Sequence, residues 1–277
     1  MEKTGFFNGD FLPIEQIKIP VDNLAVNRGY GAFDFFGVIN NKPFYGDRHL
    51  KRFQNTMQLL KISINFSESD IEGIIQKLID LNEKKDFYFK LFALPTEPDH
   101  TIGSKSSLII LPVDAPQYEK DNFESGVKII SKAYTRFLPE AKSTNYLPLI
   151  FWYEEITQSG AIDVLYHTHN VVCETSRGNI FCVKDDIVFT PDKNILKGIT
   201  RSVVIDILNQ NNYKLSESDI LINELKEADE IFLSSTTKKI MPVVQLDNSV
   251  INNKEIGPVT RWLMQTFNEI QENWGNN

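Results

Sequence analysis

The sequence predicts an α+β fold divided into two domains. Strand-like and helix-like segments mix along its 277 residues without the strict β-α alternation of a doubly wound sheet. That length is enough for two domains that each bury a hydrophobic core. Residues 114–125 are polar and contain Pro116, which makes this stretch the best candidate for a connection between domains. We therefore expect a small N-terminal domain over residues 1–117, a linker over 118–125 and a larger C-terminal domain over 126–277.

The N-terminal part predicts two hairpins, two helices and two further strands. Asn8-Gly9 is a strong two-residue turn signal, and Asn40-Asn41 marks a second hairpin. Asp47 is the expected N-cap of the first helix, and Ser69 begins a capping box for the second. Hydrophobic residues recur at three- and four-residue steps in both helices. The expected ranges are a helix over 47–62, a helix that starts at 69, and strands over 87–94 and 106–113.

The C-terminal part predicts short strands and three helices. Gly160 ends the first of these helices, and the segment Leu196 to Arg201 opens the second. Asp185-Asp186 marks a hairpin, and Ser234 to Thr237 forms a hydroxyl-rich turn after a short apolar strand. The expected strands are 126–133, 164–166, 171–173, 180–184, 187–190 and 230–233, and the expected helices are 145–159, one from 196 and one over 256–273.

Composition and charge argue against several classes of function. The net charge is −8 and the pI is about 5.1, whereas a nucleic-acid binder has a basic footprint. No apolar run approaches the roughly 20 residues of a membrane span, and the N-terminus lacks a signal-peptide pattern. Cys173 and Cys182 form neither a disulfide framework nor a metal-binding spacing. The sequence therefore predicts a cytoplasmic protein with no nucleic-acid, membrane or metal partner.

Five features carry the candidate chemistry, and each has an ordinary structural explanation when it is taken alone. Lys142 suits a nucleophilic amine, although most lysines lie on the surface. Glu174 follows an apolar strand and by itself is a loop carboxylate. Gly198 to Arg201 offers free N–H groups at a helix start, which suits a phosphate, but its threonine is equally an ordinary N-cap. Ser234 to Thr237 is a second cluster of hydroxyls or a plain turn. Arg52 lies off the apolar stripe of its helix, as a solvated side chain does.

Taken together and in this order, these features resemble the class IV pyridoxal-phosphate aminotransferases, which include branched-chain aminotransferase, D-amino acid aminotransferase and aminodeoxychorismate lyase. The resemblance covers nearly the whole chain. It rests on segments that occur in the same order and with similar spacing: Asn27 to Asp34, His49 to Arg52, Lys142 to Leu147, Glu174 to Phe181, Leu196 to Arg201 and Ser234 to Val243. It implies a fold-type IV architecture, in which a smaller N-terminal α/β sandwich precedes a larger C-terminal β-barrel-like domain with flanking helices. It also implies pyridoxal 5'-phosphate as cofactor, a cofactor site at the domain junction and a homodimer.

The resemblance assigns roles to the cofactor-binding residues. Lys142 is expected to form a Schiff base with the cofactor and to move a proton between the substrate Cα and the cofactor C4′. Glu174 is expected to keep the pyridine nitrogen protonated, and Tyr146 to bind the phenolic oxygen of the ring. The residues expected to bind the phosphate and the rest of the cofactor are Arg52, Ile199, Thr200, Ser235 and Thr236.

The substrate side of the pattern departs from the family. Phe33 falls at an aromatic pocket position, Thr237 is expected near the substrate, and Lys90 lies near the position where branched-chain enzymes have an arginine for the substrate carboxylate. Lysine attracts that anion but lacks the bidentate fork of arginine. Asp34 stands where a glutamate is more usual, and Thr175 stands where many members have glycine.

The sequence is compatible with four functions. The first is an aminotransferase that moves the amino group of an L-amino acid, with an apolar or branched side chain, to a 2-oxo acid such as 2-oxoglutarate. The second is a lyase that forms 4-aminobenzoate and pyruvate from aminodeoxychorismate. A D-amino acid aminotransferase fits less well, because residues 95–100 lack the Arg-x-His pair of those enzymes. A catalytically silent member of the family is the fourth, and the presence of Lys142 argues against it.

Overall fold

The computed structural model describes residues 3–82, 86–95, 106–114, 116 and 118–276. The Arg-x-His position considered above falls within residues 95–100, of which only Pro95 is among the described residues. The chain forms two compact units. The first contains residues 1–115, 141–146 and 273–277, and the second contains residues 116–140 and 147–272. The predicted bounds placed the whole of 126–277 in one domain, whereas the segment with Lys142 returns to the first unit because its backbone pairs with a strand there.

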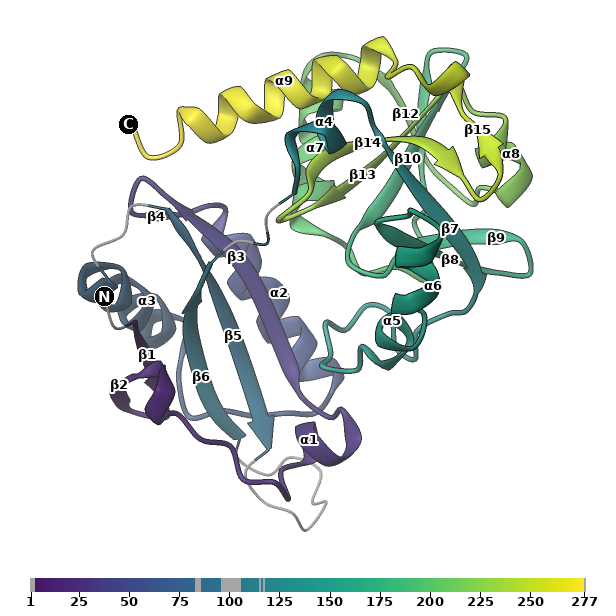
Figure 1. Cartoon of the computed structure of the whole chain (residues 1–277). Coiled ribbons are helices and arrows are strands. Elements are labelled where there is room, and N and C mark those ends of the chain that lie inside the picture. The colour runs from purple at the N-terminus through teal and green to yellow at the C-terminus, as the bar shows by residue number, and fades with distance from the viewer. Residues whose placement is uncertain (1–2, 83–85, 96–105, 115, 117, 277) are drawn as a thin grey trace. The chain divides into compact units, whose positions relative to one another are not determined.

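The first unit is a six-stranded sheet with helices packed on it (Figure 1). Each neighbouring pair of strands is antiparallel, in the order β2-β1-β6-β5-β3-β4. The helix α2 packs on β3, and α3 packs on β1 and β6. The strands are β1 (Thr4–Phe7), β2 (Asp10–Pro13), β3 (Ala32–Ile39), β4 (Lys42–Pro43), β5 (Phe87–Pro95) and β6 (Ser106–Val113). The helices are η1 (Ile14–Gln16), α1 (Leu24–Arg28), α2 (Gly46–Leu59) and α3 (Glu68–Asn82).

The local signals of this unit are mostly confirmed, and both predicted helix caps are wrong. The hairpins turn at Asn8-Gly9 and Asn40-Asn41 as expected. Asp47 lies in the first turn of α2, because Tyr45 in the left-handed conformation is the N-cap. The reciprocal capping bonds of α3 join Ser67 and Asp70 instead of starting at Ser69, since the helix begins at Glu68, directly after Ser67.

The second unit is built on a nine-stranded mixed sheet that curves into a half-barrel. Its order is β12-β11-β10-β13-β14-β7-β8-β9, with β15 paired to β14. The pairs β11/β12, β14/β7 and β7/β8 are parallel. The strands are β7 (Val127–Ala133), β8 (Asp163–Thr168), β9 (Val171–Thr175), β10 (Asn179–Lys184), β11 (Ile187–Thr190), β12 (Lys214–Glu217), β13 (Glu230–Ser235), β14 (Lys239–Leu246) and β15 (Ser249–Val250).

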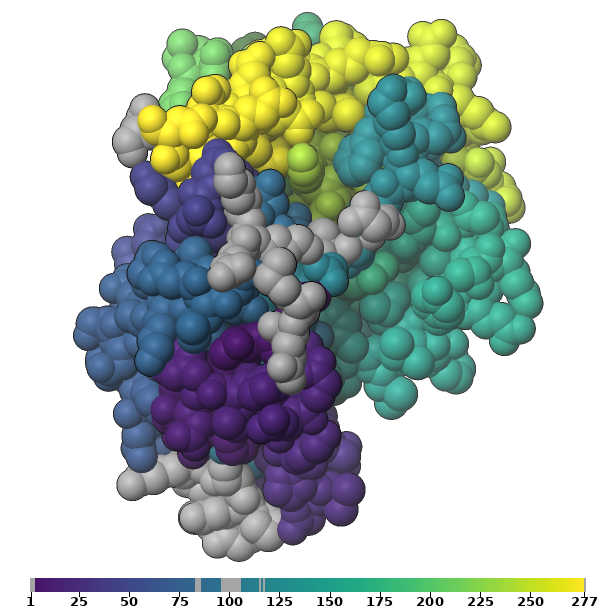
Figure 2. Space-filling model, turned by 60° about the vertical axis from the view of Figure 1, so that its left-hand side comes forward, coloured from purple at the N-terminus to yellow at the C-terminus, as the bar shows by residue number. Residues whose placement is uncertain are grey.

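Helices flank this sheet, which agrees with the predicted α+β fold class. The helix α9 packs on β13 and β14, and Figure 2 shows it in yellow on the surface. The helices are α4 (Lys120–Glu124), α5 (Leu147–Phe151), α6 (Tyr153–Gln158), α7 (Ile199–Gln210), α8 (Ile222–Lys226), η2 (Asn252–Lys254) and α9 (Pro258–Glu272). Within the described part of the chain, no helix has the length and apolar character required to cross a membrane.

The helix predicted over 145–159 is wrong in its extent. Asn145 and Tyr146 belong to the first unit and are not helical, and Pro148 lies in the first turn of α5. The helix is then interrupted at Trp152, which separates α5 from α6. The indole of Trp152 packs against Tyr134 and Tyr166. Aromatic packing in the second unit therefore overrides the local helical signal. The predicted linker over 118–125 contains the short helix α4.

Candidate active site

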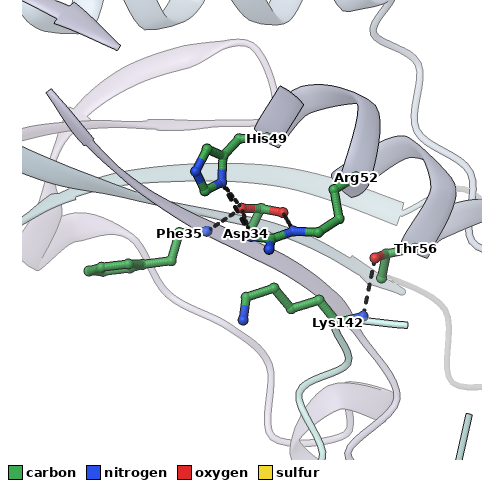
Figure 3. Close-up of polar contacts among 6 residues, drawn as sticks. All are labelled: Asp34, Phe35, His49, Arg52, Thr56 and Lys142. Atoms are coloured by element: carbon green, nitrogen blue, oxygen red, sulfur yellow. Dashed lines mark hydrogen bonds and ion pairs between the residues drawn. The ribbon is translucent and has the colours of Figure 1, made fainter. Parts of the chain in front are cut away.

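The backbone of Lys142 is fixed from both sides within the first unit. Its carbonyl oxygen accepts a hydrogen bond from the Phe33 N–H on β3 at 3.0 Å. Its own N–H donates to the hydroxyl of Thr56 on α2 at 3.1 Å (Figure 3). A bridge between Ala32 and Ser143 and a bond from Thr144 N–H to the Gly31 carbonyl continue this pairing. The lysine side chain therefore starts from a rigid position between a strand and a helix.

A buried cluster of Asp34, His49 and Arg52 lies beside this lysine (Figure 3). Arg52 donates from Nε to Oδ2 and from Nη2 to Oδ1 of Asp34, both at 2.8 Å, which is a bidentate pair. His49 Nδ1 lies 2.7 Å from Oδ1, and it must be the donor because the carboxylate is ionised. Burial would raise the pKa of Asp34, but the charge of Arg52 and the contact with His49 outweigh it and hold that pKa well below its usual range.

Arg52 is thus not the solvated residue that its place off the apolar stripe suggested. Its side chain is only 10% exposed. His49, Arg52 and Thr56 follow helical spacing on α2, so one face of this helix presents all three toward β3 and Lys142. Burial lowers the pKa of His49, against the opposing effect of Asp34, so the ring is neutral near pH 7.

An aromatic ring from β3 adjoins the amine of Lys142. The Nζ atom of Lys142 lies 4.6 Å from the centre of the Phe33 ring. Tyr146 packs edge-on to the same ring, with ring centres 5.6 Å apart. Lys90 Nζ lies 5.1 Å from the Phe92 ring and 5.9 Å from the Phe33 ring. The structure thus brings together Lys142, Tyr146, Phe33 and Lys90 around one aromatic residue.

A second group of polar residues surrounds Glu174 in the second unit. This buried carboxylate lies on β9, one residue before the end of the strand, and accepts a hydrogen bond from the Leu196 N–H at 2.9 Å. Its other oxygen lies 3.1 Å from Nε of Arg136, an ion pair in which both side chains are nearly buried. Arg136 also donates to the carbonyl of Ser176. An arginine and a backbone N–H therefore hold the carboxylate in one orientation.

The loop after Leu196 leads into an uncapped helix N-terminus. Asn179 donates to the Leu196 carbonyl at 2.7 Å, and a Cβ at Gly198 would clash with the Asn179 side chain. Gly198 is the N-cap of α7, and no side chain accepts a hydrogen bond there. The first turn, with Ile199 and Thr200, contains no acidic residue. Such a helix start offers unsatisfied N–H groups and a positive dipole end to an anion.

The hydroxyl-rich turn begins at the end of β13. Ser235, Thr236 and Thr237 are half-buried, and the Lys238 N–H donates to the Ser235 hydroxyl at 3.0 Å. Ser234 is buried, and its hydroxyl has no hydrogen-bond partner among the described residues. The turn therefore presents several hydroxyls at one place in the second unit.

The side chain of Thr175 is used within its own turn and is not a binding side chain in the group around Lys142 or the group around Glu174. It is fully buried, and its hydroxyl donates to the Gly178 carbonyl at 3.1 Å, so it closes its own turn. Among the described residues, no cluster of three His, Cys, Asp or Glu side chains has the geometry of a metal site.

Sequence reasoning missed Arg136, Thr56, Asp163 and Lys238. Arg136 pairs with Glu174, and Thr56 fixes Lys142. Asp163 and Lys238 form a buried ion pair. Their partners are distant in sequence, so periodicity and spacing give no signal for these pairs. The one available hint was Arg136 itself, a single charge within the aromatic segment Tyr134 to Leu138.

Comparison with known proteins assigns the family. The model of the family described as Amino-transferase class IV matches residues 31–246. The chain is 29% identical to D-alanine aminotransferase of Staphylococcus aureus strain N315, over 98% of this chain and 99% of that one. It is 27% identical to a putative branched-chain-amino-acid aminotransferase of Methanocaldococcus jannaschii, over 98% and 97%.

Solved structures share the fold. The branched-chain aminotransferase of Thermoproteus uzoniensis with norvaline superposes with a TM-score of 0.89 at 24% identity, over 98% of this chain and 95% of that one. The branched-chain aminotransferase of Escherichia coli superposes with a TM-score of 0.88 at 22% identity, over 99% and 98%. Because the family model spans most of the chain and the relatives align end to end, this protein belongs to the class IV aminotransferase family of pyridoxal-phosphate-dependent enzymes.

Proposed function

We propose that this enzyme transfers the amino group of an L-amino acid with an apolar side chain to a 2-oxo acid, with Lys142 as the catalytic amine. The observation that carries the proposal is the fixed position of Lys142. Its backbone is bonded to both β3 and α2, and its amine lies over an aromatic ring. A reactive amine needs such a defined position, because catalysis depends on the alignment of the reacting groups.

The second unit has the donors and acceptors that pyridoxal 5'-phosphate requires. When bound, this cofactor supplies an aldehyde and a ring that accepts electrons from the substrate. The uncapped start of α7 suits its phosphate, and a side chain at Gly198 would obstruct that loop. Glu174 is buried, paired with Arg136 and bonded to the same loop at Leu196, which suits a protonated ring nitrogen. The residues present therefore fit the cofactor.

Each polar residue then has one proposed task. In the first unit, Arg52 is the proposed phosphate ligand, through the guanidinium N–H groups that Asp34 does not use. In the second unit, the proposed phosphate donors are the N–H groups of Ile199 and Thr200. Ser235 and Thr236 contribute hydroxyls. Glu174 holds the proton on the ring nitrogen.

Two residues act closer to the reacting atoms. Lys142 carries the proton between the substrate Cα and the cofactor C4′. Tyr146 donates to the phenolic oxygen of the ring, and its packing against Phe33 keeps its aromatic ring in place.

The substrate preference rests on the aromatic surface beside Lys142. Phe33 and Phe92 offer an apolar contact for the amino acid side chain. Among the described residues, no acidic side chain forms an ion pair with Lys90, whose amine lies near those two rings. We propose that Lys90 attracts the substrate carboxylate. Thr237 of the second unit is proposed as a separate substrate contact.

A D-amino acid is the second candidate substrate. The observation that favours it is the similarity to D-alanine aminotransferases from several bacteria, at 27–29% identity in the Staphylococcus aureus and Listeria monocytogenes proteins. The absence of an Arg-x-His pair from residues 95–100 counts against it.

A homodimer is also proposed. The loop before Lys142 and the helix α5 expose large apolar side chains on the second unit, including Phe137 at 89%, Leu147 at 73% and Phe151 at 76%. Large apolar side chains at this exposure suit burial against another protein surface. Sedimentation should therefore give twice the mass of one chain, and a monomer at working concentrations would contradict this part of the proposal.

Visible absorbance and a donor panel test the proposed reaction. Purified protein with added cofactor should absorb visible light, and the band should bleach when a good amino donor is added. The panel should contain both enantiomers of alanine, leucine, phenylalanine and glutamate, with 2-oxoglutarate as acceptor. Faster bleaching with D-donors would shift the assignment to the second candidate. Release of 4-aminobenzoate from aminodeoxychorismate would instead identify a lyase, and protein that stays colourless with cofactor would refute both reactions.

A further inference from the structure

Lys238 is fully enclosed in the second unit, and its ammonium is paired with Asp163. The Nζ atom lies 2.5 Å from Oδ2, and the two side chains are 1% and 0% exposed. A lysine is almost never buried to this degree unless it is paired. Burial would raise the pKa of Asp163, but the charges of Lys238 and Arg177 outweigh it, so the carboxylate is ionised.

This ion pair connects to Glu174 through a short run of contacts. The second oxygen of Asp163 accepts a hydrogen bond from the Ser176 hydroxyl at 2.5 Å. The carbonyl of Ser176 accepts one from Arg136, and Arg136 pairs with Glu174. Positive and negative groups alternate along this run, so each charge is compensated by its neighbours.

The same ion pair fixes the hydroxyl-rich turn. Lys238 is the last residue of the turn that begins at Ser235, and its N–H closes that turn. The backbone brings the turn against the segment after Glu174, because Asn179 pairs with Ser234 across β10 and β13. A Cβ on Gly178 would lie 2.7 Å from the Ser234 carbonyl oxygen, so the two segments are in direct contact.

A buried ion pair usually contributes little net stability, because the desolvation of both charges offsets their attraction. Its directional bonds still define one geometry. The Lys238–Asp163 pair joins the turn over 235–238 to β8 and, through Ser176, to the segment after Glu174. We propose that Lys238 and Asp163 are positioning residues that hold the hydroxyls of Ser235 and Thr236 at a fixed separation from Glu174. This inference rests on the proposed roles of those three residues in cofactor binding.

The test is the preference of the apoenzyme for pyridoxal phosphate over pyridoxal, which lacks the phosphate. The ratio of the two dissociation constants isolates the contribution of the phosphate contacts, whereas a general loss of stability changes both constants alike. The variant Lys238→Met leaves Asp163 buried and unpaired, so we expect it to fold poorly. The double variant Lys238→Met with Asp163→Asn removes both charges with little change of volume and keeps an acceptor for Ser176.

We expect the double variant to fold and to lose about tenfold or more of the phosphate preference. Ser176→Ala keeps the ion pair and removes one bond, so its loss should be smaller, about threefold. Glu230→Gln is the matched control, because Glu230 is a buried carboxylate that caps α9 through the N–H groups of Val259 and Thr260. It should lower stability without changing the preference.

The outcomes separate this inference from the proposed function. Wild-type protein that binds neither compound, or binds them equally, would refute the proposed cofactor roles themselves. A normal wild-type preference that both the double variant and Ser176→Ala retain would refute only the positioning role. If the double variant fails to fold, Ser176→Ala alone decides between these results.

Discussion

The residues around Lys142 and the residues around Glu174 are held in place by different kinds of contact. Around Lys142, one strand and one long helix supply the contacts, and the key bonds join side chains to one another, as among Asp34, His49 and Arg52. Around Glu174, loops and turns supply them. There the bonds run between side chains and backbone groups, as from Asn179 to Leu196, and the close approach depends on glycine at 178 and 198.

This difference determines how each group should respond to substitution. In the first group each key bond joins two particular side chains. A conservative change that keeps the charge of one of them should therefore keep much of the function. In the second group the geometry is shared by several segments, so a single change should disturb more than one contact.

Replacement of Lys142 should have the largest effect. Lys142→Ala removes the proposed amine and proton carrier, so kcat/KM for the best donor should fall by about 10³-fold or more. The visible band should disappear after dialysis. The backbone bonds to Phe33 and Thr56 do not need the side chain, so the thermal midpoint of the apoenzyme should change little. Lys51→Ala, an exposed lysine on α2, is the control and should behave as wild type. Substantial turnover by Lys142→Ala would remove the basis of the proposed function.

Replacement of Glu174 should have the next largest effect. Glu174→Gln keeps an acceptor for the Leu196 N–H but removes the charge opposite Arg136. Cofactor should remain bound, as absorbance would show, while turnover falls by about 10²–10³-fold because the ring nitrogen loses its anionic partner. Glu155→Gln, in a half-exposed pair with Lys132, is the control. Turnover that is unchanged in Glu174→Gln would mean that this carboxylate does not tune the cofactor.

The two groups also differ in how far the sequence could predict them. The fold class followed from the mixture of strands and helices, and the hairpins followed from Asn8-Gly9 and Asn40-Asn41, because turn chemistry is local. The helix predicted over 145–159 was wrong, because packing of Trp152 in one unit and strand pairing of Lys142 in the other divide that segment. Tertiary contacts of this kind leave no periodic signal.

The partners of the candidate site residues show the same limit. Lys142 and Glu174 were identified through their order along the chain and through the resemblance, and their roles stay predictions. Asp34 was noticed only as a shorter carboxylate, and its bond to Arg52 needed the structure. Lys238 and Asp163 are 75 positions apart, so no spacing rule joins them. The sequence thus indicates chemically active residues more readily than it indicates the residues that orient them.

Asp34 offers a comparison of charge with geometry in the first group. Asp34→Asn leaves the buried Arg52 without its anion, which should destabilise the protein by about 3–5 kcal/mol and weaken binding of pyridoxal phosphate. Asp34→Glu keeps the charge and should lose clearly less in both measurements. Thermal unfolding and an absorbance titration with the cofactor would measure the two effects. If Asn and Glu at position 34 gave equal losses, shape would matter there more than charge, and the contrast between the two groups would not hold.

The smallest expected effect is a pH dependence from His49. Burial lowers the pKa of this histidine in the folded protein, whereas in the unfolded chain it titrates near its ordinary value of about 6.5. Asp34, Arg52 and Lys142 are the charged groups that act on it, and only Asp34 opposes the shift. Below about pH 6.5 the unfolded chain therefore holds more protons than the folded protein, and stability falls as the pH falls through this range. His49→Asn can keep the hydrogen bond to Asp34 without titrating, so its unfolding midpoint should decline less between pH 7 and pH 5. The low pKa of Asp34 affects stability only in more acidic solution, so it does not interfere with this comparison. Parallel declines of the unfolding midpoint in wild type and His49→Asn would show that His49 is not the group responsible.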